Sequence, residues 1–252
     1  MSKRSFLILS TGLFVVVLGI ILAYPYRYAI AKRLYRQVNP PPAAREPHPS
    51  VGYVYGIDVS HHQDKIDWSQ VRQWKGHPIE FVYIKASEGT TLQDNRYAEN
   101  IQGARANGLR VGSYHFFTTL SSVQSQFENF IAQVDLSQQD LIPMIDLEEM
   151  NHWKGEEYHA KLSEFLTLVE AHFGKKPLIY TFNTFYNRNL RGRYRQYHFL
   201  IARYGKESPW MRDGSNWTAW QFSEDGEIDG ISERVDLDLL SARFSIEDLQ
   251  LR

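Results

Sequence analysis

Short apolar runs alternate with amphipathic segments from Val54 almost to the end of the chain, and this alternation limits the possible folds more than any other feature. Short apolar runs bounded by turn residues are typical of buried strands, whereas an apolar period of about 3.6 residues is typical of helices. The expected strands are Val54–Val59, Phe81–Ala86, Arg110–His115, Leu141–Asp146, Leu178–Thr181, His198–Ala202 and Thr218–Phe222, with a final short strand before Asp236. The expected helices are Asn95–Asn107, Ser121–Val134 and Glu156–Phe173. This order predicts an α/β fold with a mainly parallel sheet.

The helical pattern ends early, which argues against a regular eightfold barrel. Gly108 and Gly174 stand where two of the expected helices need a C-terminal cap. No long helical pattern follows Thr181, although further strands are expected. We therefore expect an irregular TIM-like β/α barrel over residues 53–252, with a doubly wound open sheet as the alternative.

The N-terminal part of the chain has a different character. An uncharged, mostly apolar run of 19 residues extends from Phe6 to Tyr24, and as a helix it would reach about 28 Å, close to the hydrocarbon thickness of a bilayer. It predicts one N-terminal transmembrane helix within a membrane anchor, residues 1–27. A basic and proline-rich linker, residues 28–52, would follow and hold the domain off the membrane. The alternative is a signal peptide cleaved after Ala23, but Ile21 and the bulky, basic sequence that follows fit such a site poorly.

Composition and motifs exclude several function classes. The formal net charge is −1 and there are no cysteines, so neither nucleic-acid binding nor disulfides, thiolate metal sites or cysteine nucleophiles are expected. No glycine-rich phosphate loop and no Gly-x-Ser-x-Gly elbow is present. His61, His62, Asp64 and Asp67 could suggest a metal site, but consecutive histidines on a strand point to opposite faces. We expect a loop there, and neither a metal nor a cofactor.

Four acidic residues stand at or near the ends of expected strands: Asp58, Asp146, Glu148 and Asp236. Acidic residues are costly in apolar runs unless they are paired or hydrogen-bonded, and in a β/α barrel the carboxyl ends of the strands face the active site. An Asp-x-Glu alone also fits an exposed strand end, but the other carboxylates favour a shared site. Glu149 has the opposite parity and is expected in a solvated loop.

Asp146 and Glu148 are the most informative pair. Side chains two apart on a strand point the same way, with Cα atoms roughly 6.6–7 Å apart. Like charges held close raise one pKa, which leaves a neutral acid beside an ionised partner. A glycosidase needs that combination, because it protonates the leaving oxygen and stabilises a cationic transition state.

Five segments of the chain form an ordered set of motifs: Gly56-Ile57-Asp58-Val59-Ser60 with His62-Gln63 and Ile66-Asp67-Trp68, Phe81-Val82-Tyr83-Ile84-Lys85-Ala86-Ser87-Glu88-Gly89, Gly112-Ser113-Tyr114-His115-Phe116, Ile145-Asp146-Leu147-Glu148, and Trp220-Gln221-Phe222 before Val235-Asp236-Leu237. Taken in order, these segments resemble glycoside hydrolase family 25, the lysozymes first known from fungi, actinomycetes and phages. They extend from Val54 to about Leu240, so the resemblance covers the expected domain but not the anchor or linker.

The resemblance implies an irregular β/α barrel that cleaves the β-1,4 bond between N-acetylmuramic acid and N-acetylglucosamine in peptidoglycan. It makes Glu148 the general acid/base and Asp146 its partner, with Asp58 and Asp236 as further carboxylates of the cleft. The residues implied to line the groove are Tyr114, His115, Phe116, Tyr180 and Trp220. Asp238 departs from the pattern, since we expect the family to place asparagine there more often.

Several alternatives stay open at this stage. The domain could bind peptidoglycan without cutting it, or hydrolyse another acetamido polysaccharide. Substrate acetamido assistance suits two carboxylates on one strand better than direct attack does, but Asp58 or Asp236 could still be a nucleophile. Lys85 and Glu88 fit either a cleft or a structural ion pair. The basic residues around the anchor mildly favour a cytoplasmic domain, whereas the implied function requires the domain outside the cell membrane. We expect the protein to be a monomer.

Overall fold

The computed structural model describes residues 53–252, which fall in one compact unit of the chain. The predicted anchor, residues 1–27, and linker, residues 28–52, lie outside the described residues. Among the described residues, no helix combines the length and apolar character that a membrane span requires.

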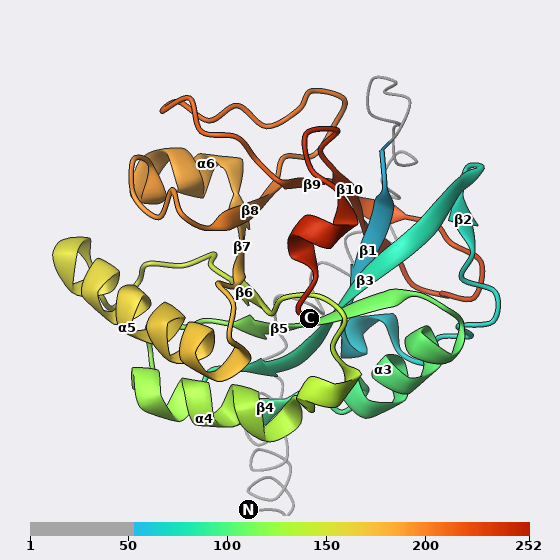
Figure 1. Ribbon diagram of the computed structural model, residues 1–252, viewed down its shortest axis with the longest axis horizontal. Coiled ribbons are helices and arrows are strands. Elements are labelled where there is room, and N and C mark those ends of the chain that lie inside the picture. The colour runs from blue at the N-terminus through green and yellow to red at the C-terminus, as the bar shows by residue number, and fades with distance from the viewer. Residues whose placement is uncertain (1–52) are drawn as a thin grey trace, which may run out of the picture. The chain divides into compact units, whose positions relative to one another are not determined.

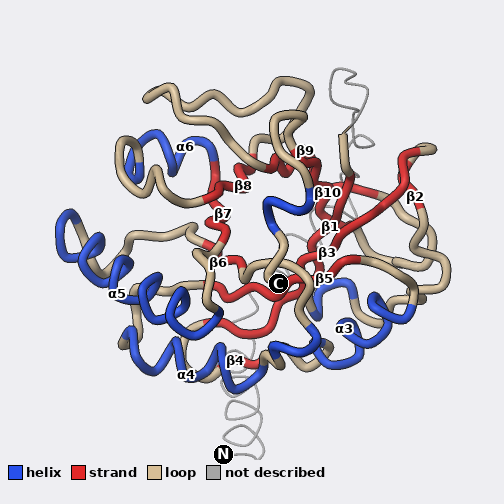
Figure 2. Tube along the Cα trace, viewed as in Figure 1, coloured by secondary structure: helices blue, strands red, loops and turns tan. Residues whose placement is uncertain are grey.

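The main strands form a closed ring (Figure 2). In chain order they are β1 (Tyr55–Val59), β3 (His77–Glu88), β5 (Arg110–Phe116), β6 (Met144–Asp146), β7 (Leu178–Phe182), β8 (His198–Ala202), β9 (Ala219–Gly226) and β10 (Val235–Leu240). Each pairs in parallel with the next from β1 to β9, while β10 is antiparallel to both β9 and β1. The pairing of β1 with β3 closes the ring, so the open-sheet alternative is wrong and the irregular barrel is confirmed. Two short strands, β2 (Gln73–Trp74) and β4 (Leu92–Gln93), pair with β3.

Helices cover only part of the ring (Figure 1). The long ones are α3 (Tyr97–Ala106), α4 (Val123–Gln133) and α5 (Gly155–Phe173), each within two residues of its predicted bounds. After β7 the helical elements are short: α6 (Asn183–Phe185) and the π-helix η4 (Tyr186–Leu190). The short 3-10 helices are η2 (His61–Gln63), η3 (Leu136–Gln138) and η5 (Ile246–Leu249).

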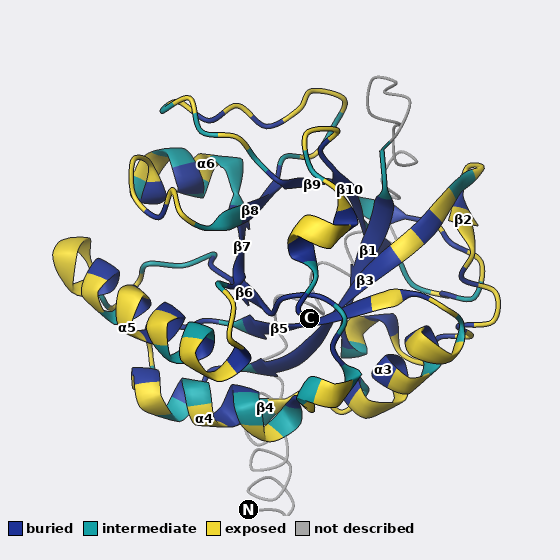
Figure 3. Ribbon diagram, viewed as in Figure 1, coloured by how far each residue is buried: buried dark blue, intermediate teal, exposed yellow. Residues whose placement is uncertain are grey.

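The helix α5 illustrates why the sequence folds this way. Its apolar side chains at helical spacing are all buried, and Figure 3 shows the ring strands buried while the helices expose their outer faces. The helix ends at Gly174, whose φ of +76° is a left-handed conformation that favours glycine. The free energy of burying this face, about 1.5–3 kcal/mol for each large apolar side chain, holds the helix against the barrel.

Inside the barrel, aromatic rings pack against glycines of neighbouring strands. A Cβ on Gly56 would lie 2.3 Å from the Phe81 ring, and one on Gly112 would lie 2.4 Å from Cε1 of Tyr83. These contacts show that Phe81 and Tyr83 point inward. By strand alternation, Lys85 does so too.

The chain's last residues cover the amino end of the barrel. The N–H of Ile142, just before β6, donates to the Leu249 carbonyl at 2.8 Å, and Leu251 donates to Asp140 at 2.8 Å. Leu249 and Leu251 are buried there. The carboxyl ends of the parallel strands therefore form the other end of the barrel, where the acidic residues lie.

Candidate active site

Three different strands bring the four predicted carboxylates to one end of the barrel. Asp58 lies near the carboxyl end of β1, and Asp146 is the last residue of β6. Strand β10 runs the other way, so Asp236 near its start lies directly opposite Asp58. Glu148 follows β6 by two residues; burial raises the pKa of both Asp58 and Asp146, and the negative charge of Glu148 raises both further. The predicted cluster therefore forms.

The Asp146–Glu148 segment is extended beyond the end of the strand. The predicted strand Leu141–Asp146 is observed only from Met144, but pairing with β7 continues for one more residue. The N–H of Leu147 donates to the Tyr180 carbonyl at 2.9 Å, and the hydroxyl of Thr181 donates to the Leu147 carbonyl at 2.6 Å. Leu147 is fully buried. This anchored residue separates Asp146 and Glu148, although Glu148 itself is a loop residue and not a strand residue.

Asp146 is the more buried of the two acids. Burial raises the pKa of Asp146 well above its ordinary value, and the charge of Glu148 raises it further, whereas Lys85 lowers it. One of its oxygens, Oδ1, has no hydrogen-bond partner among the described residues, while Glu148 is half-buried. In the free protein the surroundings therefore favour a proton on Asp146.

Glu149 is a loop residue, as its parity predicted, but it is half-buried and hydrogen-bonded instead of solvated. Its Oε1 accepts from the N–H of Thr119 at 3.2 Å and its Oε2 accepts from Nδ2 of Asn151 at 2.7 Å. These hydrogen bonds hold the neighbouring loop.

A chain of hydrogen bonds holds Asp58. The Nε2 of Gln221 donates to Oδ2 of Asp58 at 2.7 Å. The hydroxyls of Tyr180 and Tyr204 both donate to Oε1 of the same amide, at 2.9 and 3.2 Å. These two donors fix which way the amide faces, so its NH₂ group points at Asp58. Tyr180 was predicted for the groove, whereas Gln221 and Tyr204 were missed.

Tyr114 and Phe116 also face the carboxylates. The pKa of Tyr114 is raised well above its ordinary value by burial and by the charges of Asp58, Asp146 and Asp236, which places its hydroxyl among them. Phe116 is half-buried, and Nζ of Lys85 lies 5.3 Å from the centre of its ring. Lys85 also pairs with Glu88 at 2.6 Å, so both roles considered for this lysine, cleft residue and ion pair, are present.

His115 does not line the groove, and its prediction is wrong. It is fully buried, its Nδ1 is 2.9 Å from Oγ of Ser87, and its ring packs against Phe130 of α4 and Phe165 of α5. Strand alternation explains the position, because the neighbours of two inward-facing residues must point outward. Burial lowers the pKa of His115 to about 3, so it stays neutral.

Trp220 is a second correction. Its Nε1 donates to the Arg203 carbonyl at 2.7 Å, and its ring packs edge-on against Trp217 and Phe222. Only 2% of it is exposed. Gln221, a polar residue within an apolar run, takes the inward position instead, and that polarity was the available signal.

The histidine pair lies on a 3-10 turn after β1, within the expected loop. The argument that the two rings must diverge does not apply there, since the rings of His61 and His62 are 4.1 Å apart. Nδ1 of His61 lies 2.8 Å from Oδ2 of Asp94. Within residues 53–252, no group of three or more histidine, aspartate or glutamate side chains is placed to hold a metal ion.

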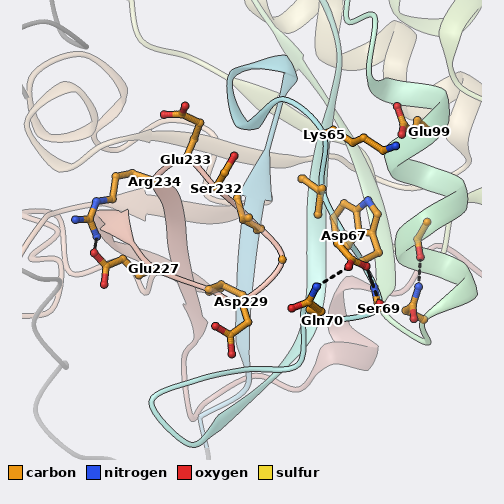
Figure 4. A pocket seen from close by; sticks show the side chains of 17 residues that line it. Lys65, Asp67, Ser69, Gln70, Glu99, Glu227, Asp229, Ser232, Glu233 and Arg234 are labelled. Carbon is orange, nitrogen blue, oxygen red and sulfur yellow. Dashed lines mark hydrogen bonds and ion pairs between the residues drawn. The ribbon is translucent and has the colours of Figure 1, made fainter. Parts of the chain in front are cut away.

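The domain also has a separate hollow of about 1330 Å³ (Figure 4). It is lined by Lys65–Gln70, part of α3 and the loop Glu227–Arg234, and none of the four carboxylates borders it. Several of its polar side chains are engaged with one another: Asp67 accepts from Ser69 and Gln70, and Arg234 pairs with Glu227. The hollow therefore lacks the group of four carboxylates that the barrel end provides.

Comparison with known proteins identifies the family. The family model "Glycosyl hydrolases family 25" matches residues 57–231. The chain belongs to this family. The uncharacterized protein YegX of Escherichia coli (strain K12) is 38% identical over 199 residues, which is 78% of this chain and 72% of that protein.

Solved structures of similar proteins support the same barrel. A family 25 glycosyl hydrolase from Bacillus anthracis is 30% identical, with a TM-score of 0.71, and the match covers 80% of this chain and 95% of that one. A bacterial lysozyme from Streptomyces coelicolor is 28% identical, with a TM-score of 0.68, and the match covers 80% of this chain and 96% of that one. The closed barrel described above is therefore a family 25 barrel.

Proposed function

We propose that this family 25 protein is a muramidase that cleaves the β-1,4 bond between N-acetylmuramic acid and N-acetylglucosamine in peptidoglycan. The observation that carries the proposal is the pair formed by buried Asp146 and half-buried Glu148 at the open end of the barrel. One of the similar solved structures, that of the Streptomyces coelicolor protein, is named a lysozyme, and this name supports the choice of substrate.

In the proposed reaction Glu148 is the general acid and Asp146 handles the substrate's acetamido group. The acetamido N–H donates to Asp146, which favours the ionised form of that carboxyl. The bound sugar also removes water from Glu148, which favours its protonated form. Substrate binding thus moves the proton of the pair from Asp146, where burial holds it in the free protein, to Glu148.

Bond cleavage then needs no nucleophile from the protein. Glu148 gives its proton to the glycosidic oxygen, which takes the electron pair of the breaking C1–O bond, while the acetamido oxygen bonds to C1. The resulting positive charge lies beside ionised Asp146. Glu148 then removes a proton from water, which attacks C1 and restores the acetamido group with retained configuration. Asp58 and Asp236 hold the surrounding network, and Tyr114, Phe116 and Tyr180 line the groove.

Digestion of purified peptidoglycan and of a chitin oligomer, side by side, tests the proposal. Mass analysis is expected to find new reducing N-acetylmuramic acid ends from the wall, and NMR of the first product is expected to show the β anomer. Cleavage of chitin but not of the wall would assign another acetamido polysaccharide, and wall binding without new ends would make this a binding protein. A trapped glycosyl ester on Asp58, Asp146 or Asp236 would replace acetamido assistance with direct attack.

We also propose that residues 1–27 anchor the protein in the cell membrane with the domain on the outer side. Peptidoglycan lies outside that membrane, so a muramidase needs this orientation to reach it. The apolar run Phe6–Tyr24 supports the anchor.

A further inference from the structure

Asp238 is an additional carboxyl deep inside the barrel. It lies on β10 opposite Gly56, two residues beyond Asp236, and it is 0% exposed. Neither of its oxygens has a hydrogen-bonding N–H or O–H donor among the described residues. An isolated ionised carboxylate in such a place would be very costly.

The neighbouring side chain across the strand pair is another carboxyl. Asp58 and Asp238 are diagonal neighbours across the β1–β10 pair and both are buried, and burial together with the charge of Asp238 raises the pKa of Asp58. Two ionised carboxylates can only accept hydrogen bonds, so a bond between them requires a proton. Gln221 donates to Oδ2 of Asp58, and this neutral amide is the donor that offsets one negative charge on the pair.

The surroundings disfavour a second charge. Burial raises the pKa of both acids well above the ordinary value, and the charge of Asp236 raises that of Asp238 further. Lys85 is engaged with Glu88 and acts on Asp146. The titratable groups that face the pair are Tyr83 of β3, Tyr114 of β5, Asp146 and Glu148 of β6 and its loop, Tyr180 of β7, Tyr204 after β8, and Asp236 of β10.

We propose that Asp58 and Asp238 hold a single proton between them at neutral pH, and that Asp238 is a positioning residue that fixes the orientation and charge of Asp58. Gln221 holds one oxygen of Asp58, and the shared proton holds the other. The pair then carries one negative charge at the floor of the cleft. The part that Asp58 plays in catalysis rests on the proposed function, but the shared proton does not.

Infrared difference spectra of the full chain at pH 7, with ¹³C-labelled aspartate, test the pair directly. Asp238→Asn leaves Asp58 ionised against an amide donor, so it should remove one carboxylic acid band and no carboxylate band. Asp58→Asn combined with Asp238→Asn should remove one band of each kind. Loss of two acid bands or of two carboxylate bands in the double variant would overturn the proposal. Asp135→Asn is the matched control, because this exposed acid has a lowered pKa and should lose one carboxylate band only.

The wild-type pair can also be tested without these variants. Its raised pKa means that the folded protein binds the proton more tightly than the unfolded chain does. This contribution to stability is present in acid and is lost as pH rises through the folded pKa. Gln221→Leu removes the donor that favours ionised Asp58, so the acid band should persist to a higher pH than in the wild type. An unchanged or lower pH of band loss would contradict the shared proton.

Wall digestion separates this inference from the proposed function. The Asp238→Asn change keeps the shape of the side chain and supplies an amide that donates to Asp58, so it should impair digestion less than Asp58→Asn does. Should the chain digest no wall, the infrared result still decides the shared proton. Impaired digestion in Asp238→Asn with an unchanged acid band would instead overturn the inference and leave the proposed function standing.

Discussion

Glu148 and Glu149 are chemically identical neighbours, yet the backbone gives them different surroundings. Glu148 faces the carboxylates of the barrel, and Glu149 accepts hydrogen bonds from Thr119 and Asn151. Glu148→Gln keeps the shape and removes the transferable proton. We expect the kcat for wall digestion to fall by about 10²–10⁴-fold, the usual cost of losing a general acid, with an unchanged circular dichroism spectrum. Glu149→Gln is the matched control and should stay within a few-fold of wild type; near-normal digestion by folded Glu148→Gln would remove it from the acid role.

Tyr180 and Tyr204 are expected to act redundantly on the Gln221 amide. Each hydroxyl donates to Oε1, so Tyr180→Phe or Tyr204→Phe leaves one donor in place. Each single change should cost at most about 1.5 kcal/mol, the upper range for one net hydrogen bond, or roughly tenfold in kcat/KM. The double variant frees the amide to turn and should cost more than the sum of both. A double-mutant cycle on wall fragments measures this, and additive effects would count against the fixed amide.

At the residue scale the sequence predicted which acidic residues lie at the site better than it predicted which way each side chain points. The four carboxylates were recognisable because an acidic residue in an apolar run is costly unless it is paired or hydrogen-bonded. They are Asp58, Asp146, Glu148 and Asp236. Groove residues were assigned by motif without applying alternation, and one of three consecutive residues in β5 had to face outward. That residue is His115. Gln221 required knowledge of the barrel, since its partners come from β1, β7 and the segment after β8.

At the element scale, local patterns predicted the elements better than their bounds. Strand β8 is observed as predicted, and α5 differs by one residue. Strand β3 starts four residues earlier than predicted, because His77 and Pro78 pair with β2. Strand β10 contains Asp236 instead of preceding it, because pairing with Asp58 extends the strand on that side. Such bounds depend on partners that are distant in sequence.

The packing of Gly112 of β5 against the Tyr83 ring of β3 is expected to make the barrel sensitive to any larger side chain at Gly112. A Cβ on Gly112 would lie 2.4 Å from Cε1 and 2.8 Å from Cδ1 of Tyr83, and Tyr83 is held by a hydrogen bond from its hydroxyl to the Ile142 carbonyl. Gly112→Ala should therefore lower the free energy of unfolding by about 1–3 kcal/mol, the usual cost of overpacking. Chemical denaturation measures it. In a Tyr83→Leu background the same substitution should cost less, and an equal cost would show that the ring is not the cause.

At the scale of the whole chain, charge is divided unevenly. Residues 1–52 contain seven lysines and arginines and one acid, while residues 53–252 contain 21 basic and 28 acidic residues. The described domain thus has a formal charge of −7, although the buried aspartates with raised pKa reduce it. Anionic lipid headgroups would attract the basic N-terminal part and repel the domain. Two causes of membrane association, apolar insertion and electrostatic adsorption, must therefore be separated.

Membrane association is expected to survive high salt because it depends on apolar insertion. The 19 residues Phe6–Tyr24 can cross a bilayer as a helix of about 28 Å, whereas adsorption of basic residues is screened within about 3 Å at 1 M salt. The full chain should thus stay in the membrane fraction after a wash with about 1 M salt, the concentration at which charges are screened this strongly. Detergent should release it. A truncated variant that starts at Val51 should be soluble and digest isolated wall at the full chain's rate. Salt release would indicate adsorption, and native protein in the soluble fraction with its N-terminus near Tyr24 would indicate a cleaved signal peptide.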